Sequence, residues 1–201
     1  MRPEPAVARL EQLLAEVRAC SACAAHLPLG PRPVLRAAAT ARLLIVGQAP
    51  GRRVHETGIP WNDPSGERLR AWMEVDRDTF YDTRRIAIIP MGLCYPGKGR
   101  GGDLPPRPEC APLWHARLLR ELPGVDLVLT IGAYAQRFYL GTNARANLTE
   151  TVRAGASYGP RFLPLPHPSP RNLRWLLRNP WFELEVLPRL RTRVRELLAM
   201  G

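Results

Sequence analysis

The stretch Leu43–Gly66, LLIVGQAPGRRVHETGIPWNDPSG, decides the fold, because a strand-like run ends abruptly in a long irregular segment. The four apolar residues at its start are typical of a buried strand. The residues that follow are rich in glycine, proline and charge. Since a strand and a helix are usually joined by about 2–6 residues, we interpret this segment as a binding or catalytic loop.

Three further apolar runs, at residues 86–89, 125–131 and 162–165, repeat the strand pattern. Segments with helical spacing of apolar residues separate them. Strands that alternate with helices predict a parallel sheet covered on both faces, here a three-layer α/β/α sandwich around a four-stranded parallel sheet. Because the chain has no internal repeat and no low-complexity linker, we expect a single domain over residues 1–201.

Helices are predicted at 4–19, from Ser65 onwards, at 108–122, at 132–140 and at 180–199. Ser65 is expected to cap the second of these helices. In the last helix, an apolar stripe is expected to face the core; its members are Leu184, Leu187, Leu190, Val194 and Leu197. Residues 24–40 and 95–108 are predicted to be irregular, since turn-forming residues dominate them.

The net charge of +11, from 29 Lys and Arg against 18 Asp and Glu, favours a polyanionic partner such as nucleic acid. A basic surface that only aids solubility is the alternative. No apolar run approaches the roughly 18–20 residues of a membrane span. The charged N-terminal segment is not typical of a secretory signal, so we expect a cytoplasmic protein with no membrane association.

Four cysteines, Cys20, Cys23, Cys94 and Cys110, form a close pair followed by two more distant members. Disulfides are disfavoured in the cytoplasm, so the pattern indicates a four-thiolate metal site. Both zinc and an iron–sulfur cluster accept four sulfur ligands, and composition does not separate them. Four buried, inert cysteines are the alternative.

Three loops that leave the carboxyl ends of predicted strands carry most of the unusual residues: Gln48–Asp63, Pro90–Cys94 and His167–Asn172. Ligands of parallel sheets bind at these ends, so the loops are the candidate site. Two motifs stand out within and beside these loops: the first motif, Gly47-Gln48-Ala49-Pro50-Gly51, and the second motif, His167-Pro168-Ser169-Pro170. Together with the four cysteines, these motifs resemble the uracil-DNA glycosylase superfamily, and specifically its iron–sulfur branch.

The resemblance implies a four-stranded parallel sheet between helices, DNA as the partner, and a 4Fe-4S cluster on Cys20, Cys23, Cys94 and Cys110. We expect this cluster to be structural. A glycosylase must flip its target base out of the duplex and break the C1′–N bond. The pocket therefore needs a flat face for the base, donors for the charge on the leaving base, and a water that attacks C1′.

Trp61 and His167 are the candidates for the first two tasks. Trp61 follows Gly58-Ile59-Pro60, where related enzymes carry a stacking aromatic residue, although it could instead be a core tryptophan. A neutral His167 could donate its N–H to the base carbonyl, as an oxyanion hole does, with help from the backbone N–H groups near Gln48 and Ala49. A purely structural histidine is the alternative.

The group that activates water is harder to assign, because Ala49 occupies the place of an acid in the best-known branch. In another iron–sulfur branch an Asp further along the loop is implicated, and the similar segment here places Asp63 in that role. Capping of the next helix is the alternative for Asp63. His55 and Glu56 are lesser candidates.

Base recognition also departs from the uracil-specific relatives, which carry an Asn four residues before the third cluster cysteine. Pro90 stands there in this chain and offers no side-chain hydrogen bond. Gln48 or Asn62 would have to read the base edge, so a broader range of deaminated bases is expected. The base-binding candidates are Trp61, Asn62 and Gly47.

DNA contacts are expected from small and basic groups of the same loops. The candidates are Pro50, Gly51, Ser65, Ser169, Pro170 and Arg171, with phosphate charge from Arg52, Arg53, Lys98 and Arg100. Arg171 follows the second motif, where relatives place a side chain that fills the hole left by the flipped base.

The sequence thus predicts a monomeric, monofunctional DNA glycosylase that removes a deaminated base, uracil first among them, in base excision repair. The alternative is a DNA-binding member of the fold that has lost hydrolysis, which Ala49 and Pro90 favour. A nucleotide- or RNA-directed relative is a third, weaker hypothesis.

Overall fold

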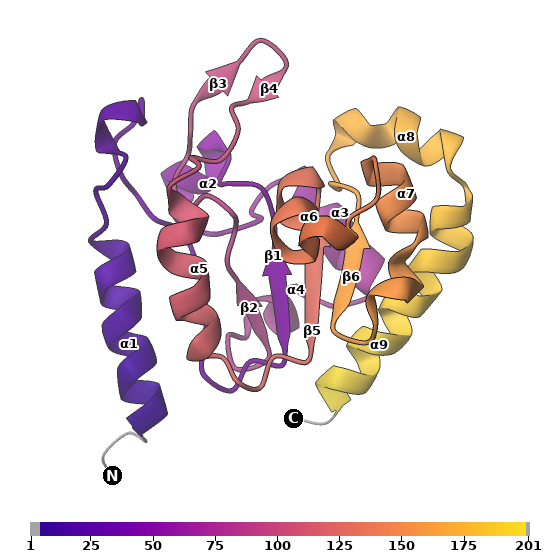
Figure 1. The fold of residues 1–201 in the computed structure, drawn as a ribbon, viewed down its shortest axis with the longest axis horizontal. Helices are drawn as coiled ribbons and strands as arrows, with labels where there is room; N and C mark the ends of the chain where they lie inside the picture. The colour runs from indigo at the N-terminus through magenta and orange to yellow at the C-terminus, as the bar shows by residue number, and fades with distance from the viewer. Residues whose placement is uncertain (1–4, 200–201) are drawn as a thin grey trace.

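A four-stranded parallel sheet in the order β2-β1-β5-β6 forms the centre of the computed structural model, which describes residues 5–199 (Figure 1). The strands are β1 (Leu43–Val46), β2 (Ile86–Ile88), β5 (Leu127–Ile131) and β6 (Phe162–Leu165). In the register, Leu43 of β1 lies between Ile86 and Leu127. The predicted strands and the α/β sandwich are confirmed.

Alternate residues of β1 point to opposite faces of the sheet, as the strand geometry requires. Leu44 and Val46 join the core under α1 (Pro5–Arg18), α5 (Cys110–Arg120) and α6 (Ala133–Leu140). Leu43 and Ile45 join the core under α3 (Pro64–Met73), α7 (Leu148–Arg153) and α9 (Leu187–Ala199). Each face is therefore sealed by helices, which leaves the strand ends as the place for a site.

Shorter elements connect these layers. They are α2 (Arg52–Thr57), α4 (Arg77–Tyr81), α8 (Leu173–Arg178), the 3₁₀ turns η1 (Ala24–His26), η2 (Gly141–Asn143), η3 (Gly155–Tyr158) and η4 (Pro170–Asn172), and the π-helical turn η5 (Phe182–Val186). Residues 24–40 also contain a bridge, in which Arg36 pairs with Ile88 beside β2.

The predicted stripe of the last helix is wrong at Leu184, whose relative exposure is 75%. The π-helical turn η5 precedes α9, and its wider turn makes the side chains point in other directions than they would in a continuous α-helix. Phe182 and Val186 are buried from this turn instead. The remaining members of the stripe, which lie in α9, face the core as expected.

The prediction that 95–108 is wholly irregular is also wrong. A short antiparallel hairpin, β3 (Lys98–Gly99) with β4 (Gly102–Asp103), forms within it. Gly102 has a φ of +141°, which a residue with a side chain rarely adopts, so the tight turn depends on glycine. Figure 1 shows this hairpin rising above the edge of the sheet where β1 ends.

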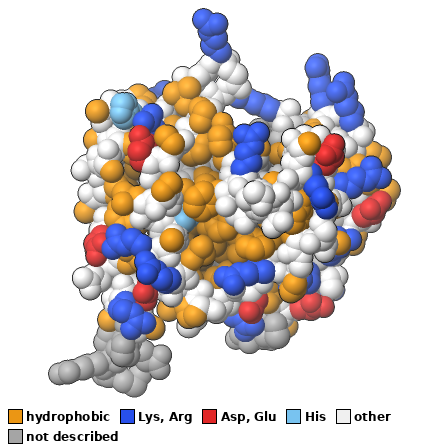
Figure 2. Space-filling model, viewed as in Figure 1, with side chains coloured by type: hydrophobic (Ala, Val, Ile, Leu, Met, Phe, Trp, Pro, Cys, Tyr) orange, Lys and Arg blue, Asp and Glu red, His pale blue; other side chains and the backbone are white. Residues whose placement is uncertain are grey.

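Basic side chains are spread over the face of the molecule seen in Figure 2 rather than gathered in one patch. Some of them project at the top of that view, where Figure 1 places the β3–β4 hairpin. Within residues 5–199, no helix is long and apolar enough to cross a membrane.

Candidate functional site

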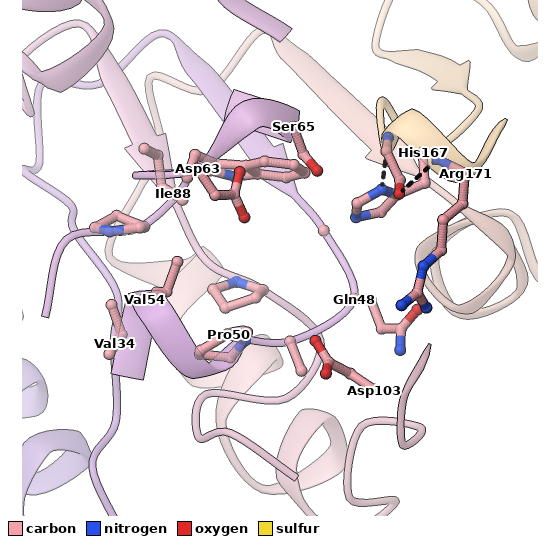
Figure 3. A pocket seen from close by; sticks show the side chains of 17 residues that line it. Val34, Gln48, Pro50, Val54, Asp63, Ser65, Ile88, Asp103, His167 and Arg171 are labelled. Carbon is pink, nitrogen blue, oxygen red and sulfur yellow. Dashed lines mark hydrogen bonds between the residues drawn. The ribbon is translucent and has the colours of Figure 1, made fainter. Parts of the chain in front are cut away.

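A cavity of about 190 Å³ lies at the carboxyl ends of the strands, where the loops after β1, β2 and β6 meet (Figure 3). Three of its lining groups come from distant segments: Trp61 and Asp63 from the long loop, and His167 from the loop after β6. The other lining residues are Val34, Gly47, Gln48, Ala49, Pro50, Gly51, Val54, Pro60, Ser65, Ile88, Pro90, Asp103, Ser169 and Arg171.

Trp61 forms one wall and is held in an unusual backbone conformation. Its φ of +56° lies in the left-handed region, which costs a bulky residue about 1–3 kcal/mol and is typical of functional sites. Two glycines make room for it. A Cβ on Gly66 would lie 1.8 Å from the Trp61 carbonyl oxygen, and a Cβ on Gly47 would lie 2.7 Å from the indole ring.

Hydrogen bonds fix the loop on both sides of Trp61. The Tyr81 hydroxyl donates to the Pro60 carbonyl at 2.8 Å, and Arg70 donates to the Trp61 carbonyl at 3.4 Å. The indole ring lies 5.5 Å from the His167 ring, centroid to centroid, at an angle of 32°. The half-buried Trp61 and the imidazole thus form neighbouring walls of one cavity.

Asp63, and not Ser65, caps α3, which corrects the predicted start of this helix. The Asp63 Oδ1 accepts the Gly66 N–H at 2.8 Å, and Pro64 occupies the first helical turn, where its missing N–H costs nothing. Ser65 is buried in the same turn. The carboxylate also borders the cavity (Figure 3), so the two roles considered for Asp63 are compatible.

His167 is held in one tautomer by its neighbours. The Ser169 N–H donates to Nδ1 at 3.2 Å, so Nδ1 carries no proton and the neutral ring is protonated at Nε2. Burial lowers the pKa of His167, and the nearby Asp63 opposes this effect. Asn172 donates to the His167 carbonyl at 2.8 Å. A fixed, neutral N–H donor therefore borders the cavity.

The loop that carries His167 is also tied to α3. One guanidinium nitrogen of Arg68 donates to the carbonyls of Pro168 and Ser169 at 3.3 and 3.2 Å. Because α3 begins at the Asp63 cap, this contact sets the spacing between the tryptophan loop and the histidine loop.

The β3–β4 hairpin supplies a cavity residue that the sequence did not reveal, Asp103. Gln48 donates to the Leu104 carbonyl at 3.1 Å, and Arg171 donates to the Gly101 carbonyl at 2.8 Å. These two bonds hold the hairpin against both motifs. A glycine-rich segment with one Asp carries no pattern that marks the Asp as a site residue, so only the folded hairpin identifies it.

A buried histidine holds Pro90 in place at the wall of the cavity, and no sequence pattern identified this histidine as a site residue. His115 Nε2 donates to the Pro90 carbonyl at 3.1 Å, and its Nδ1 accepts from the Tyr139 hydroxyl at 2.7 Å. Burial lowers the pKa of His115 to about 4. The ring is neutral at pH 7, and the Pro90 carbonyl is already engaged on this side.

Several candidates do not line the cavity. Asn62 instead accepts a hydrogen bond from Arg77 at 3.5 Å, and Pro170 lies in η4 outside the lining. His55 is buried next to Tyr95, and burial lowers its pKa. Arg52, predicted to contact phosphate, pairs with Glu56 at 2.8 Å across one turn of α2.

The four cysteines carry free thiols, and none forms a disulfide. Burial raises the pKa of Cys94 to about 11 and that of Cys110 to about 12, and the other cysteines add to both effects. The Leu93 N–H donates to the Cys110 sulfur at 3.3 Å. These four donors are of the kind that zinc or an iron–sulfur cluster requires. Within residues 5–199, however, no three His, Cys, Asp or Glu side chains are already gathered as metal ligands.

A comparison with known families identifies the superfamily of the chain. The family model described as the Uracil DNA glycosylase superfamily matches residues 35–191. The match spans the whole sheet and both loop motifs, together with Cys94 and Cys110, and begins after Cys20 and Cys23.

Proposed function

The chain belongs to the uracil DNA glycosylase superfamily, and we propose that it hydrolyses the C1′–N bond of a deaminated base flipped out of DNA. The observation that carries the proposal is the shared cavity of Trp61 and a neutral His167, whose Nε2–H is the kind of donor that a leaving base requires. DNA acts as the partner, and the product is an abasic site in an unbroken strand.

In the proposed reaction, the flipped base stacks on Trp61, a contact worth about 1–3 kcal/mol per base. As the C1′–N bond breaks, its electron pair moves to the base. His167 Nε2–H then donates to the base carbonyl on which the negative charge accumulates. Such a preorganised donor, in a site from which water is excluded, contributes about 2.7–4 kcal/mol.

Asp63 supports the other side of the reaction. Its carboxylate offsets the positive charge on the sugar and orients the water that attacks C1′. The Gly66 N–H holds Oδ1, which fixes the carboxyl group in place before the substrate arrives. Gln48 and the backbone N–H groups near Ala49 lie at the cavity wall and would contribute further donors to the base.

Uracil is the first candidate base, and the substrate range extends to other deaminated bases. Pro90 presents no donor to the cavity, and His115 already engages its carbonyl. Since Asn62 points toward Arg77, Gln48 is the remaining side-chain amide in the lining, and Leu104 already accepts one of its N–H groups. A site with so few side-chain contacts to the base edge would discriminate weakly between bases.

We further propose that Cys20, Cys23, Cys94 and Cys110 hold a 4Fe-4S cluster, as in the iron–sulfur branch. Because burial raises the pKa of Cys94 and Cys110, a bound metal would be needed to turn these two thiols into thiolates at neutral pH. The Leu93 N–H that donates to the Cys110 sulfur would stabilise a ligating sulfur. The cluster would join α1 to the segment before α5 and take no part in hydrolysis. Zinc on the same thiols is the alternative.

The test is incubation of metal-loaded protein with duplexes and single strands that contain uracil, hypoxanthine or xanthine, followed by alkali. Alkali-dependent cleavage at the damaged base supports the proposal. If no substrate in the panel is cut, the proposal fails.

A non-hydrolytic DNA-binding member of the family is the second candidate, and the observation that favours it is Ala49 in the place of the motif acid. Asp63→Asn separates the two. In an enzyme the rate would fall far more than the affinity for DNA, whereas in a binding protein neither would change much.

A further inference from the structure

The hairpin places a second carboxylate at the cavity, on the side opposite the tryptophan loop (Figure 3). An ideal Cβ built on Gly51 would lie 3.3 Å from Oδ2 of Asp103, so this carboxylate lies against the backbone of the first motif. The hairpin is held there by the hydrogen bonds from Gln48 to Leu104 and from Arg171 to Gly101.

The residues that follow the hairpin lie close to the first motif. Leu104 contacts Gln48 through its carbonyl, and the ideal Cβ of Gly92 would lie 2.9 Å from Pro106 and 3.4 Å from the Ala49 methyl group. The first motif carries no acid of its own, since Ala49 and Gly51 flank Pro50. Asp103 therefore brings a carboxylate to a segment that lacks one.

The two carboxylates of the cavity differ in how they are held. Oδ1 of Asp63 accepts the Gly66 N–H, so a backbone donor holds this carboxylate in place. Within residues 5–199, the Asp103 carboxylate accepts no hydrogen bond and makes no ion pair. Both of its oxygens are therefore available to a water in the cavity.

The charges around Asp103 act in both directions. Asp103 is exposed on the hairpin, but the side that faces the cavity is partly desolvated, which raises its pKa. Arg171 and Lys98 lower this pKa, and the negative charge of Asp63 raises it. Burial raises the pKa of Tyr95, and the Asp103 charge raises it further, while Arg52 lowers it. The resulting raised pKa is the direction expected for a group that accepts a proton during a reaction.

We propose that Asp103 is a second catalytic carboxylate, which receives the proton of the attacking water; this inference rests on the proposed glycosylase function. The water oxygen forms a bond to C1′ as the C1′–N bond breaks and its electron pair leaves with the base. One water proton passes to Asp103 and then to solvent, which also protonates the released base. Asp63 orients the water and offsets the charge of the sugar.

The experiment compares Asp103→Asn with the unaltered protein at saturating enzyme, on whichever deaminated base the substrate panel identifies. The rate of base release in a single turnover is expected to fall about 100-fold or more, since general bases contribute roughly 10²–10⁴. Affinity for DNA should stay the same or tighten, because a negative charge is lost. Asp103→Glu should restore part of the rate.

Asp126→Asn is the matched control, since Asp126 precedes β5 at the amino end of the sheet and pairs with Arg42. It should release base at the unaltered rate. A pH profile gives a second readout: the acidic limb of the unaltered protein should move or vanish in Asp103→Asn.

An Asp103→Asn rate within threefold of the unaltered protein, with the acidic limb unchanged, would overturn this inference and leave the glycosylase function standing. A parallel fall in rate and in DNA affinity would also overturn it, because it would mark a role in binding or folding. Inactivity of the unaltered protein on every substrate would overturn both proposals.

Discussion

The cavity and the cysteine region both collect residues that are distant in sequence, but they differ in how complete they are. At the cavity, the chain itself positions Trp61, Asp63 and His167: Gly47 and Gly66 make room for the indole, and Asp63 and His167 accept backbone N–H groups. In the cysteine region, burial raises the pKa of the Cys94 and Cys110 thiols, and within residues 5–199 these groups are not arranged as a metal site.

This difference separates the residues proposed to act in the reaction from the residues proposed to stabilise the fold. The cavity is preorganised by covalent geometry and hydrogen bonds, which is what a site that stabilises developing charge requires. The cysteine region offers four thiols of the kind that bind a metal, so under the proposed cluster its stability would depend on metal binding. We therefore expect changes at the cysteines to act on folding and changes at the cavity to act on rate.

The largest effect should come from Cys110→Ser, which removes one thiol of the proposed cluster. We expect the iron and sulfide content to collapse and the free energy of unfolding to fall by more than about 4 kcal/mol, a part of the roughly 10–16 kcal/mol that structural zinc supplies to small peptides. Metal analysis and chemical denaturation measure both. Ala19→Ser, at an exposed position beside Cys20 after α1, is the control. Unchanged metal content and stability would show that the cysteines are inert.

His167→Ala should act on rate alone. Loss of the Nε2–H donor is expected to slow single-turnover base release by about 10²–10³, or 2.7–4 kcal/mol, as for other oxyanion donors. The metal content should remain that of the unaltered protein. A variant that keeps the full rate would show that His167 takes no part in the reaction. The cavity and the cysteine region would then not differ in the way proposed here.

Acid should lower the free energy of unfolding through His115, which lies behind Pro90. His115 is neutral when folded because its pKa is about 4, while in the unfolded chain it protonates near its ordinary pKa of 6.5. The unfolded state therefore binds more protons in this window, and this contribution to stability is lost as the pH falls from 6.5 toward 4, by about 3 kcal/mol in all. Urea unfolding at several pH values measures it. His115→Gln, which keeps a donor for Pro90, should flatten the dependence; an identical slope in this variant would contradict the assignment.

The smallest effect should come from Gly47→Ala. The new methyl group would lie 2.7 Å from the Trp61 ring and displace it, so the stacking contribution of about 1–3 kcal/mol to the damaged base should shrink. The preference for damaged over undamaged DNA in a binding titration measures this. Gly124→Ala, at the other end of the sheet, adds a Cβ at ordinary contact distance and is the control. Equal preferences in the two variants would exclude Trp61 as the stacking residue.

The sequence predicted those parts of the fold that local pattern controls. Short apolar runs such as Leu43–Val46 mark buried strands without further information, and loops after parallel strands must meet at one edge. Leu184 was misplaced because a π-helical turn interrupts the period of the last helix. The cap at Asp63 was considered only as an alternative, since Ser65 in the same segment is an equally good capping residue by type.

Asp103 in the cavity and His115 behind Pro90 could not be identified from local sequence pattern. Asp103 reaches the first motif only because a hairpin forms and is bound by Gln48 and Arg171. His115 lies on a helix face whose residue pattern is typical of a core-facing helix. Its contact with Pro90 joins segments that are distant in sequence. Such contacts depend on tertiary packing, which no short stretch of residues encodes.

The most direct test of the central claim is to count free base and abasic sites released together from a single-turnover reaction of metal-loaded protein with deaminated DNA. We expect one free base for each abasic site, a strand that stays intact until alkali is added, and a matching fall of both products in His167→Ala. DNA that is bound tightly while no free base is released from any deaminated substrate would contradict it.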